Sequence, residues 1–413
     1  MLKRGLSALK GAVPEAPPVR TFLGIVLVLT LGQGLWMALN AVYATTVLGL
    51  SPGQFGVGVG IAAGVALALS TPAGHLADRI GPRRVQMWSL VAMAPLSAAL
   101  LLVSGYSAYL VVISVQAVAY STSRSARLAM IAGIAPPDQR VAVRAYVRTV
   151  SNVSATVGAA LAGVLLTVGS ETAYRSAVLV VAFAYLASGL LTLRLPAVSP
   201  RPAKPGPALT VLRDRPFLAF VVLDGLLSMH NLLLEVVLPL WVLHRTGAPR
   251  WVIAGLLLLN TVLVVVLQVR ASRGTDEPGP AARAARGGAL CIAVACVIFS
   301  LTEGVSAVTA SVLLFLGAIA HVLGEVRQAA GSWGISFGLA PEDAQGQYQG
   351  TASMGADIGR MIAPAVLTWL AIEYGTFGWL VMAVGFAAVG AALPPVVAWA
   401  ARRRTERAVP TSA

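Results

Sequence analysis

Two otherwise apolar segments each carry a stripe of polar side chains at the spacing i, i+4, i+7 and i+11. The stripes are Asp224, Ser228, Asn231 and Glu235 in one segment, and His321, Glu325, Gln328 and Ser332 in the other. Residues at this spacing share one face of a helix. An ionisable group at hydrocarbon depth costs roughly 2.5–3.5 kcal/mol, which makes it a functional candidate. The stripes therefore make Asp224, Glu325 and Glu235 functional candidates, and as titratable acids they are the groups that a proton-coupled mechanism would use.

A second interpretation is that these groups only pair with one another, as Glu325 could with Arg127. Pairing alone would account for Glu235 more readily than for the other two acids, because Glu235 falls nearer the outer end of its segment. His230 and Arg327 lie off their stripes by about 120° and are predicted to be structural. Asp357 and Arg360 are one helical turn apart and are expected to pair.

Two further segments repeat the polar spacing, and the four stripes fall on the first, fourth, seventh and tenth predicted helices. Gln116, Tyr120, Ser123 and Arg127 form the third stripe, and Gln33, Met37 and Asn40 form a partial fourth. This regularity predicts one shared polar cavity. The residues predicted to line it for a substrate are Gln33, Trp36, Asn40, Tyr43, Gln116, Tyr120, Asn231, His321 and Gln328. Their aromatic rings suit a lipophilic or cationic guest.

Two arginines in the inner half of the fourth predicted helix, Arg124 and Arg127, have two interpretations. They either line the cavity and bind an anionic substrate, or they act as counter-ions to Asp78 or to the acids of the seventh and tenth predicted helices.

The composition places these stripes in a membrane protein. Of 413 residues, 57% are hydrophobic and only 11% are charged, and the mean hydropathy is +0.80. Soluble domains contain about 25% charged residues. The fold class is therefore an all-α, polytopic membrane protein, which excludes a soluble enzyme, a secreted disulfide scaffold and a disordered chain. Cys291 and Cys296 share one apolar segment and are predicted to be small packing residues.

Twelve apolar segments are predicted to be transmembrane helices in two bundles of six. Their ranges are 21–45, 54–73, 85–104, 106–133, 144–168, 173–195, 217–242, 250–270, 288–303, 306–338, 347–370 and 376–400. The predicted organisation is an N-terminal segment (1–20), a first bundle (21–195), a Pro-rich linker (196–216), a second bundle (217–400) and a basic tail (401–413). Small residues recur at matching positions, 154–163 and 355–364, which predicts close helix contacts and an internal duplication.

The distribution of basic residues predicts the orientation. With the N-terminus inside, the cytoplasmic segments hold 23 Lys and Arg residues and the outer loops hold three. This asymmetry predicts that both termini and the linker are cytoplasmic. Most of the net charge of +14 then faces anionic lipid rather than nucleic acid.

One short motif connects the chain to a known family. The run Gly74-His-Leu-Ala-Asp78-Arg79-Ile-Gly81-Pro-Arg83-Arg84 stands between the second and third predicted helices. It resembles the signature loop of the major facilitator superfamily, G-x-x-x-D-R-x-G-R-[KR], except that Pro82 replaces a frequent arginine. The resemblance implies the two-bundle fold and a cytoplasmic gate formed by Gly74, Asp78, Arg79, Gly81, Arg83 and Arg84. It implies that Asp78 latches near the start of the eleventh helix, and that Gly74 and Gly81 permit a tight turn. The corresponding region of the second half, 268–287, is degenerate.

A second resemblance concerns the tenth and eleventh helices. Glu325, Trp333 and the run Leu339–Gly350 resemble bacterial multidrug–proton antiporters of that superfamily, in which an acid on helix 10 and one on helix 7 carry protons. Glu325 and Asp224 match those acids by position. The chain departs from the antiporter pattern in two places. The fifth helix lacks the proline of that pattern, and the fourth lacks its early arginine.

The function expected from these features is secondary active transport, as proton-coupled efflux (antiport) of lipophilic or cationic small molecules by alternating access. An uptake symporter, an exporter of one metabolite and a non-transporting membrane sensor remain as alternatives. G-x-x-x-x-G-K-[ST] and metal-ligand spacings are absent from the sequence, so a proton gradient without nucleotide, metal or other cofactor is expected to supply the energy. We expect a multi-pass monomer in the bacterial cytoplasmic (inner) membrane, with membrane lipids as further partners and no enzymatic activity.

Overall fold

The computed structural model describes residues 16–197 and 210–408, and every regular element in them is a helix. The chain divides into two compact units. Unit 1 comprises Met1–Pro136, Tyr146–Ala208 and Glu342–Gly350, and unit 2 comprises Pro137–Ala145, Leu209–Pro341 and Thr351–Ala413. Much of the predicted N-terminal segment, of the linker and of the basic tail lies outside the described residues.

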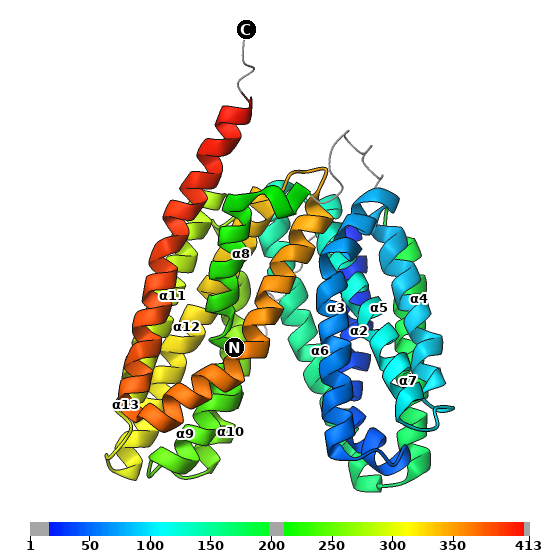
Figure 1. The fold of residues 1–413 in the computed structure, drawn as a ribbon, viewed down its shortest axis with the longest axis horizontal. Coiled ribbons are helices and arrows are strands. Elements are labelled where there is room, and N and C mark those ends of the chain that lie inside the picture. The colour runs from blue at the N-terminus through cyan, green and yellow to red at the C-terminus, as the bar shows by residue number, and fades with distance from the viewer. Residues whose placement is uncertain (1–15, 198–209, 409–413) are drawn as a thin grey trace, which may run out of the picture. The chain divides into compact units, whose positions relative to one another are not determined.

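Unit 1 is built from α2 to α7, drawn from blue to green-cyan in Figure 1. The elements are α2 (Pro17–Val42), which continues as the π-helix η1 (Tyr43–Val47), α3 (Pro52–Ile80), α4 (Pro82–Ala99), α5 (Tyr106–Ile134), α6 (Arg140–Val168) from Tyr146 onward, and α7 (Glu171–Leu191). Helix α5 packs against α3 and α4, and α7 packs against α2 and α4. The core between them contains Leu29, Tyr43, Met93, Tyr109 and Val181.

Unit 2 is built from α8 to α13. The elements are α8 (Arg215–Ser228), the π-helix η5 (Leu233–Val237), α9 (Leu238–Arg245), α10 (Trp251–Ala271), α11 (Pro278–Ser300), α12 (Ala307–Leu339) and α13 (Gln345–Ala408) from Thr351 onward. Helix α12 packs against α10 and α11. A Cβ atom at Gly288 would lie 2.6 Å from the Gly324 carbonyl oxygen, so α11 and α12 touch backbone to backbone.

Helix α13 contains two of the predicted helices, joined at a sharp kink. Gly375 has φ 56° and ψ −134°, a conformation that residues with a side chain rarely adopt, and the helix direction changes there (Figure 1). The kink is held from outside α13: Arg245 donates to Glu303 Oε1 at 3.0 Å and to the Ile372 carbonyl, and Thr376 donates to Glu303 Oε2 at 3.1 Å.

The seventh predicted helix, 217–242, is wrong as a continuous element. Helix α8 ends at Ser228, a turn at Met229 and His230 follows, and η5 leads into α9. Pro239 has no N–H to bond the carbonyl of Glu235, which accounts for the departure from α-helical hydrogen bonding just before α9. The side chain of Asn231 donates to the Ser228 carbonyl at 2.8 Å and caps the break.

The motif region 74–84 is predicted to be a loop, but almost all of it is helical. Helix α3 continues through Pro72 to Ile80, and α4 begins at Pro82. The connection is Gly81 alone, with φ 93°. Gly81 therefore makes the tight turn, whereas Gly74 is an ordinary helical residue and does not. The ninth predicted helix starts ten residues early, at Pro278 rather than 288.

Nine helical stretches of the described residues are long and apolar enough to cross a membrane. One of them, Gln345–Arg403, contains both predicted helices on either side of Gly375. Helices α4 and α5, which carry two arginines each, are not among the nine. Twelve spans with cytoplasmic termini therefore stay a prediction.

The predicted close contact at the small-residue segments is confirmed. In unit 1 a Cβ at Gly158 of α6 would lie 2.1 Å from the Leu31 carbonyl oxygen of α2, and in unit 2 a Cβ at Gly359 of α13 would lie 2.0 Å from that of Gly225 on α8. The same kind of helix pair thus crosses at glycine in both units.

We expect Gly158→Ala to lower the free energy of unfolding by about 1–3 kcal/mol, because the added methyl overlaps backbone that cannot rotate away. The matched control is Gly163→Ala on the same helix, where nothing lies within 4 Å of the new methyl. Thermal unfolding of the purified protein in detergent measures the difference. Equal melting temperatures for the two variants would show that the crossing is not tight.

Candidate functional site

The acid Asp224 is buried in unit 2 and is held by two neutral donors from α12. Its side chain is on α8, and the residue is 8% exposed. Ser332 donates a short hydrogen bond to Asp224 Oδ1, and Gln328 Nε2 donates to the same oxygen at 3.1 Å. Gln328 Nε2 also donates to Ser332 Oγ at 2.9 Å. The two predicted stripes therefore face each other at Asp224.

Two histidines extend this contact. His230 Nε2 lies 3.3 Å from Gln328 Oε1, and His230 Nδ1 lies 3.3 Å from His321 Nε2. Both residues are buried, and their rings meet edge to face with centroids 5.1 Å apart. His230 is predicted to lie off its stripe, yet the structure places its ring against Gln328 and His321; its structural role stays a prediction. The prediction projected one helix through residue 230, but α8 ends at Ser228, so the projected direction does not hold beyond it.

Glu325 is the second buried acid, 6% exposed on α12. Asn260 Nδ2 of α10 donates to Glu325 Oε2 at 2.9 Å, and His321 Nδ1 lies 3.9 Å from the same oxygen. Sequence reasoning missed Asn260, although an amide inside a segment of mean hydropathy 2.6 was a usable signal. We call this set the acid network; its members are Asp224, His230, Asn260, His321, Glu325, Gln328 and Ser332.

Two predicted members of the helix-7 stripe lie outside the acid network. Glu235 is on η5 and is exposed, although it remains within electrostatic range of Glu325 and Arg360. The Asn231 amide is used to cap Ser228. The turn at Met229 and His230 interrupts the helix, so the projected common face with Asp224 does not extend to Asn231 or Glu235. Asp357 and Arg360 pair at 3.4 Å, as predicted.

In unit 1 the predicted cavity residues divide into core and partly buried groups. Tyr43 is 1% exposed and donates its hydroxyl to the Leu100 carbonyl at 3.0 Å, and Gln116 Nε2 donates to Ser97 Oγ of α4 at 2.7 Å. The polar atoms of both side chains join helices of the core, and their place in a substrate cavity stays a prediction. Tyr120 hydrogen-bonds to Arg127. The half-buried predicted positions are Gln33, Trp36, Asn40, Tyr120, Arg124 and Arg127.

The start of α13 is held within unit 1 by Asp78. Its carboxylate accepts the backbone N–H of Gly346 at 2.6 Å and of Gln347 at 2.9 Å. These N–H groups belong to the first turn of a helix, where they have no partner inside the helix and carry partial positive charge. A Cβ at Gly74 would lie 2.1 Å from the Gly346 carbonyl oxygen. Gly74 thus allows the close approach rather than a turn.

The basic residues of the motif lie around this contact. Arg83 donates to the Leu193 carbonyl at 2.6 Å, which ties α4 to the end of α7, whereas Arg79 and Arg84 are exposed. The geometry at Asp78 is that of a helix-terminus latch; its role in gating stays a prediction.

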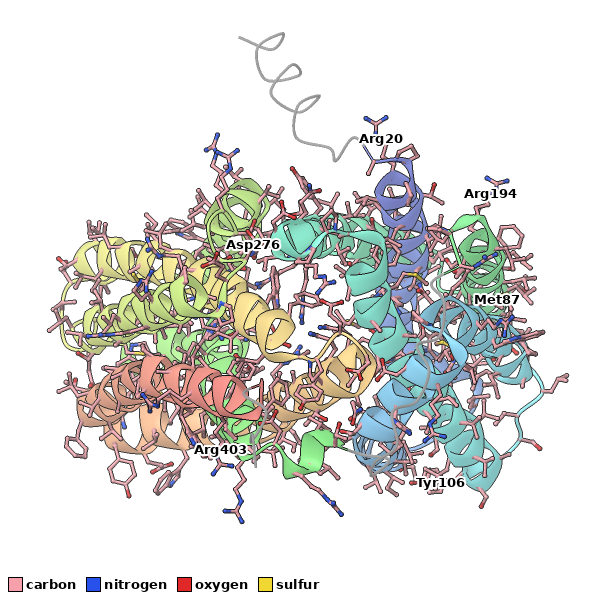
Figure 2. All side chains as sticks on the ribbon, turned by 90° about the horizontal axis from the view of Figure 1, so that it is seen from above. Arg20, Met87, Tyr106, Arg194, Asp276 and Arg403 are labelled. Carbon is pink, nitrogen blue, oxygen red and sulfur yellow. The ribbon has the colours of Figure 1, made fainter. Side chains whose placement is uncertain are left out.

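Unit 2 contains a comparable contact at Asp276, in the connection between α10 and α11 (Figure 2). Asp276 accepts the backbone N–H of Val141, in the first turn of α6. The Arg144 guanidinium lies over the Trp333 ring at 5.1 Å and holds the same segment to α12. Sequence reasoning missed Asp276, because the region 268–287 lacks the motif that marks Asp78.

Burial and the nearby carboxylate of Asp138 raise the pKa of Asp276, and the Val141 N–H only partly offsets them. A carboxyl whose folded-state pKa is raised destabilises the fold once it ionises, so stability falls as pH rises from the ordinary carboxyl range through the folded pKa. We expect Asp276→Asn to raise the melting temperature by about 1–2 °C at neutral pH and to lose this advantage in acid. Thermal unfolding across pH checks this, with Asp357→Asn as the control. A stabilisation that grows on acidification would contradict it.

Comparisons with known proteins agree with this architecture. A family model described as the Major Facilitator Superfamily matches residues 21–364. A bacterial homologue of the iron transporter ferroportin, in an outward-facing state, has a TM-score of 0.73 at 14% identity, over 93% of this chain and 99% of that chain. The human organic anion transporter MFSD10 (TETRAN) has a TM-score of 0.68 at 14% identity, over 92% and 100%. The transporter FucP in the outward conformation has a TM-score of 0.69 at 14% identity, over 93% and 98%. These identities show a shared fold only, and a search of curated proteins found no match.

Proposed function

The chain belongs to the major facilitator superfamily of multi-pass membrane transporters, and we propose that it is a proton-coupled transporter in which the acid network binds the proton. The observation that carries this proposal is the pair of buried carboxyls, Asp224 and Glu325, connected through Gln328 and the two histidines. Members of this superfamily bind small-molecule substrates.

Neutral contacts make these carboxyls suitable for reversible protonation. Ser332 and Gln328 donate to Asp224, and Asn260 donates to Glu325. A carboxyl that is held by neutral donors can change its charge without breaking those bonds, whereas one locked to an arginine cannot. Burial makes the charged form costly, which supports switching between the protonated and ionised states.

The charge of the site favours a cationic or lipophilic substrate and the direction of efflux. When Asp224 and Glu325 lose protons, they leave negative charge that attracts a cation. Each proton that enters down one pH unit supplies about 1.4 kcal/mol, and each net charge that moves through 100 mV supplies about 2.3 kcal/mol. Two protons entering for one monovalent cation leaving move one net charge inward, so together they provide roughly 5 kcal/mol. Efflux antiport across a bacterial cytoplasmic membrane, with Asp224 and Glu325 as the coupling acids, is the form of the proposal to test first.

The experiment uses inverted membrane vesicles that contain the protein and are energised to an acid interior. Tetraphenylphosphonium, a lipophilic cation, is added while a fluorescent dye reports the interior pH; vesicles without the protein are the control. Antiport predicts proton release on addition of the cation. Further acidification, or accumulation of the cation inside intact cells as the pH gradient grows, would favour the symport alternative. The absence of any response to a panel of cations and neutral drugs would contradict multidrug antiport.

A further inference from the structure

The acid network has a fixed hydrogen-bond polarity, and that polarity identifies where a proton can be added. The starting point is the Gln328 amide, whose Nε2 lies within hydrogen-bond distance of Asp224 Oδ1 and Ser332 Oγ. A rotated amide would place its oxygen against Asp224 Oδ1, which is an acceptor. Gln328 Oε1 therefore faces His230 Nε2 and accepts from it, so His230 carries its proton on Nε2.

The contacts of His321 also determine which of its ring nitrogens carries the proton. His321 Nε2 lies 3.1 Å from the His230 carbonyl oxygen, which can only accept, so His321 also carries a proton on Nε2. The bare Nδ1 of His230, 3.3 Å away, accepts from the same Nε2–H. Two separate contacts thus assign this tautomer.

One ring nitrogen of the pair then has neither a proton of its own nor a hydrogen-bond donor facing it. In a neutral His321 the bare atom is Nδ1, which is buried without a hydrogen-bond partner and lies 3.9 Å from Glu325 Oε2. An unprotonated nitrogen and an ionised carboxylate are both acceptors and repel each other in this buried position. A single added proton converts the repulsion into attraction, whether it resides on the carboxyl or on the imidazole.

We infer that Glu325 and His321 share one exchangeable proton, which binds to either Glu325 Oε2 or His321 Nδ1, so that His321 is a proton-binding partner of Glu325 and not only a substrate-cavity residue. This rests on the proposed function for its role in transport, but the proton site itself can be tested without a substrate. Gln328 and His230 act as positioning residues, because they set which nitrogen of His321 is open.

The charged groups around the acid network come from four other elements, and of these Glu235 acts on Glu325 directly. Asp224 lies on α8 and Glu235 on η5; Arg360 on α13 acts electrostatically on both acids, and Arg144 at the start of α6 acts on Asp224. They set the pH at which the pair titrates. They do not provide an alternative partner for His321 Nδ1, which lies beside Glu325.

The test is an infrared difference titration of the full chain in lipid nanodiscs, which detects both carboxylic acid and imidazolium bands. His321→Gln retains a donor near the position of Nε2 but removes Nδ1, and His321→Asn is a second variant in case the first does not fold. His244→Gln makes the same chemical change at an exposed histidine of α9 and is the matched control. Glu325→Gln and Asp224→Asn identify the carboxyl.

We expect one titration in the wild type that loses its carboxyl component in Glu325→Gln and shifts by about one pH unit or more in His321→Gln, while His244→Gln leaves it in place. A titration that is unchanged in both His321→Gln and His321→Asn would overturn the inference. So would a titration that disappears in Asp224→Asn and persists in Glu325→Gln. Failure of the proposed function is separate: the shared proton would titrate as expected, but no cation would release protons in the vesicle experiment.

Discussion

Replacing Glu325 with glutamine is expected to abolish the coupling of transport to the pH gradient while substrate exchange across the membrane continues. Glutamine retains an acceptor for Asn260 but cannot bind and release a proton at this position. The proposed exchange of two protons for one monovalent cation moves the cation by about a hundredfold in concentration per pH unit when the membrane potential is zero. This ratio should fall to about one in the variant, because Asp224 and Glu325 are proposed to bind protons as one network. Accumulation of tetraphenylphosphonium in proteoliposomes under an imposed pH gradient measures the effect.

The matched control for this substitution is Glu373→Gln, which removes an exposed carboxylate from α13 outside the acid network. It should retain the wild-type dependence on the gradient. Exchange of labelled for unlabelled cation, measured without a gradient, separates a loss of coupling from a loss of folding. A Glu325→Gln protein that still accumulates the cation in proportion to the pH gradient would show that the proton is carried elsewhere.

Replacing Asp78 with asparagine is expected to release the start of α13 from its contact in unit 1. The carboxylate accepts two backbone N–H groups, whereas an amide presents one acceptor and directs its own N–H toward the other donor. A hydrogen bond to a charged group contributes about 1.5–3 kcal/mol, so the detached state should become about ten- to a hundredfold more populated. Transport should slow because the start of α13 is no longer held against Asp78 in one conformation of the transport cycle.

A buried reporter measures this release directly. Ser125 is 1% exposed and lies next to Gly350, where a Cβ would be 3.5 Å from Ser125 Oγ. With Cys291 and Cys296 replaced by alanine, a Ser125→Cys protein should react with N-ethylmaleimide about ten- to a hundredfold faster when Asp78→Asn is added. Asp357→Asn in the same background is the control. An unchanged rate would mean that Asp78 does not hold this segment.

The sequence predicted the helical architecture and both buried acids because periodicity carries that information. Asp224 and Glu325 stand out as charges in apolar segments at a spacing that fixes their faces. The break after Ser228 follows from the hydrogen bond that Pro239 cannot donate and from the cap by Asn231. Both change the direction in which later side chains point without changing the pattern of apolar residues. The position of His230 could not be predicted for that reason.

A polar stripe can either join a helix to its neighbours in the core or contribute to a functional network, and the sequence does not distinguish the two. Gln116 belongs to a stripe of the same form as those of the acid network and Tyr43 lies beside another, yet their polar atoms bond neighbouring helices of the core. Asn260 belongs to no stripe, yet its amide donates to Glu325. The rotation of each helix about its axis decides whether a polar side chain bonds a neighbouring helix of the core or contacts other polar side chains of a network. That rotation is set by packing.

The most direct test of proton coupling uses a substrate gradient alone. Proteoliposomes of purified protein, loaded with tetraphenylphosphonium and diluted into cation-free medium at the same pH, should take up protons as the cation leaves, and Glu325→Gln proteoliposomes should not. Cation efflux from the wild type with no change in internal pH would contradict the proposal that the acid network couples protons to transport.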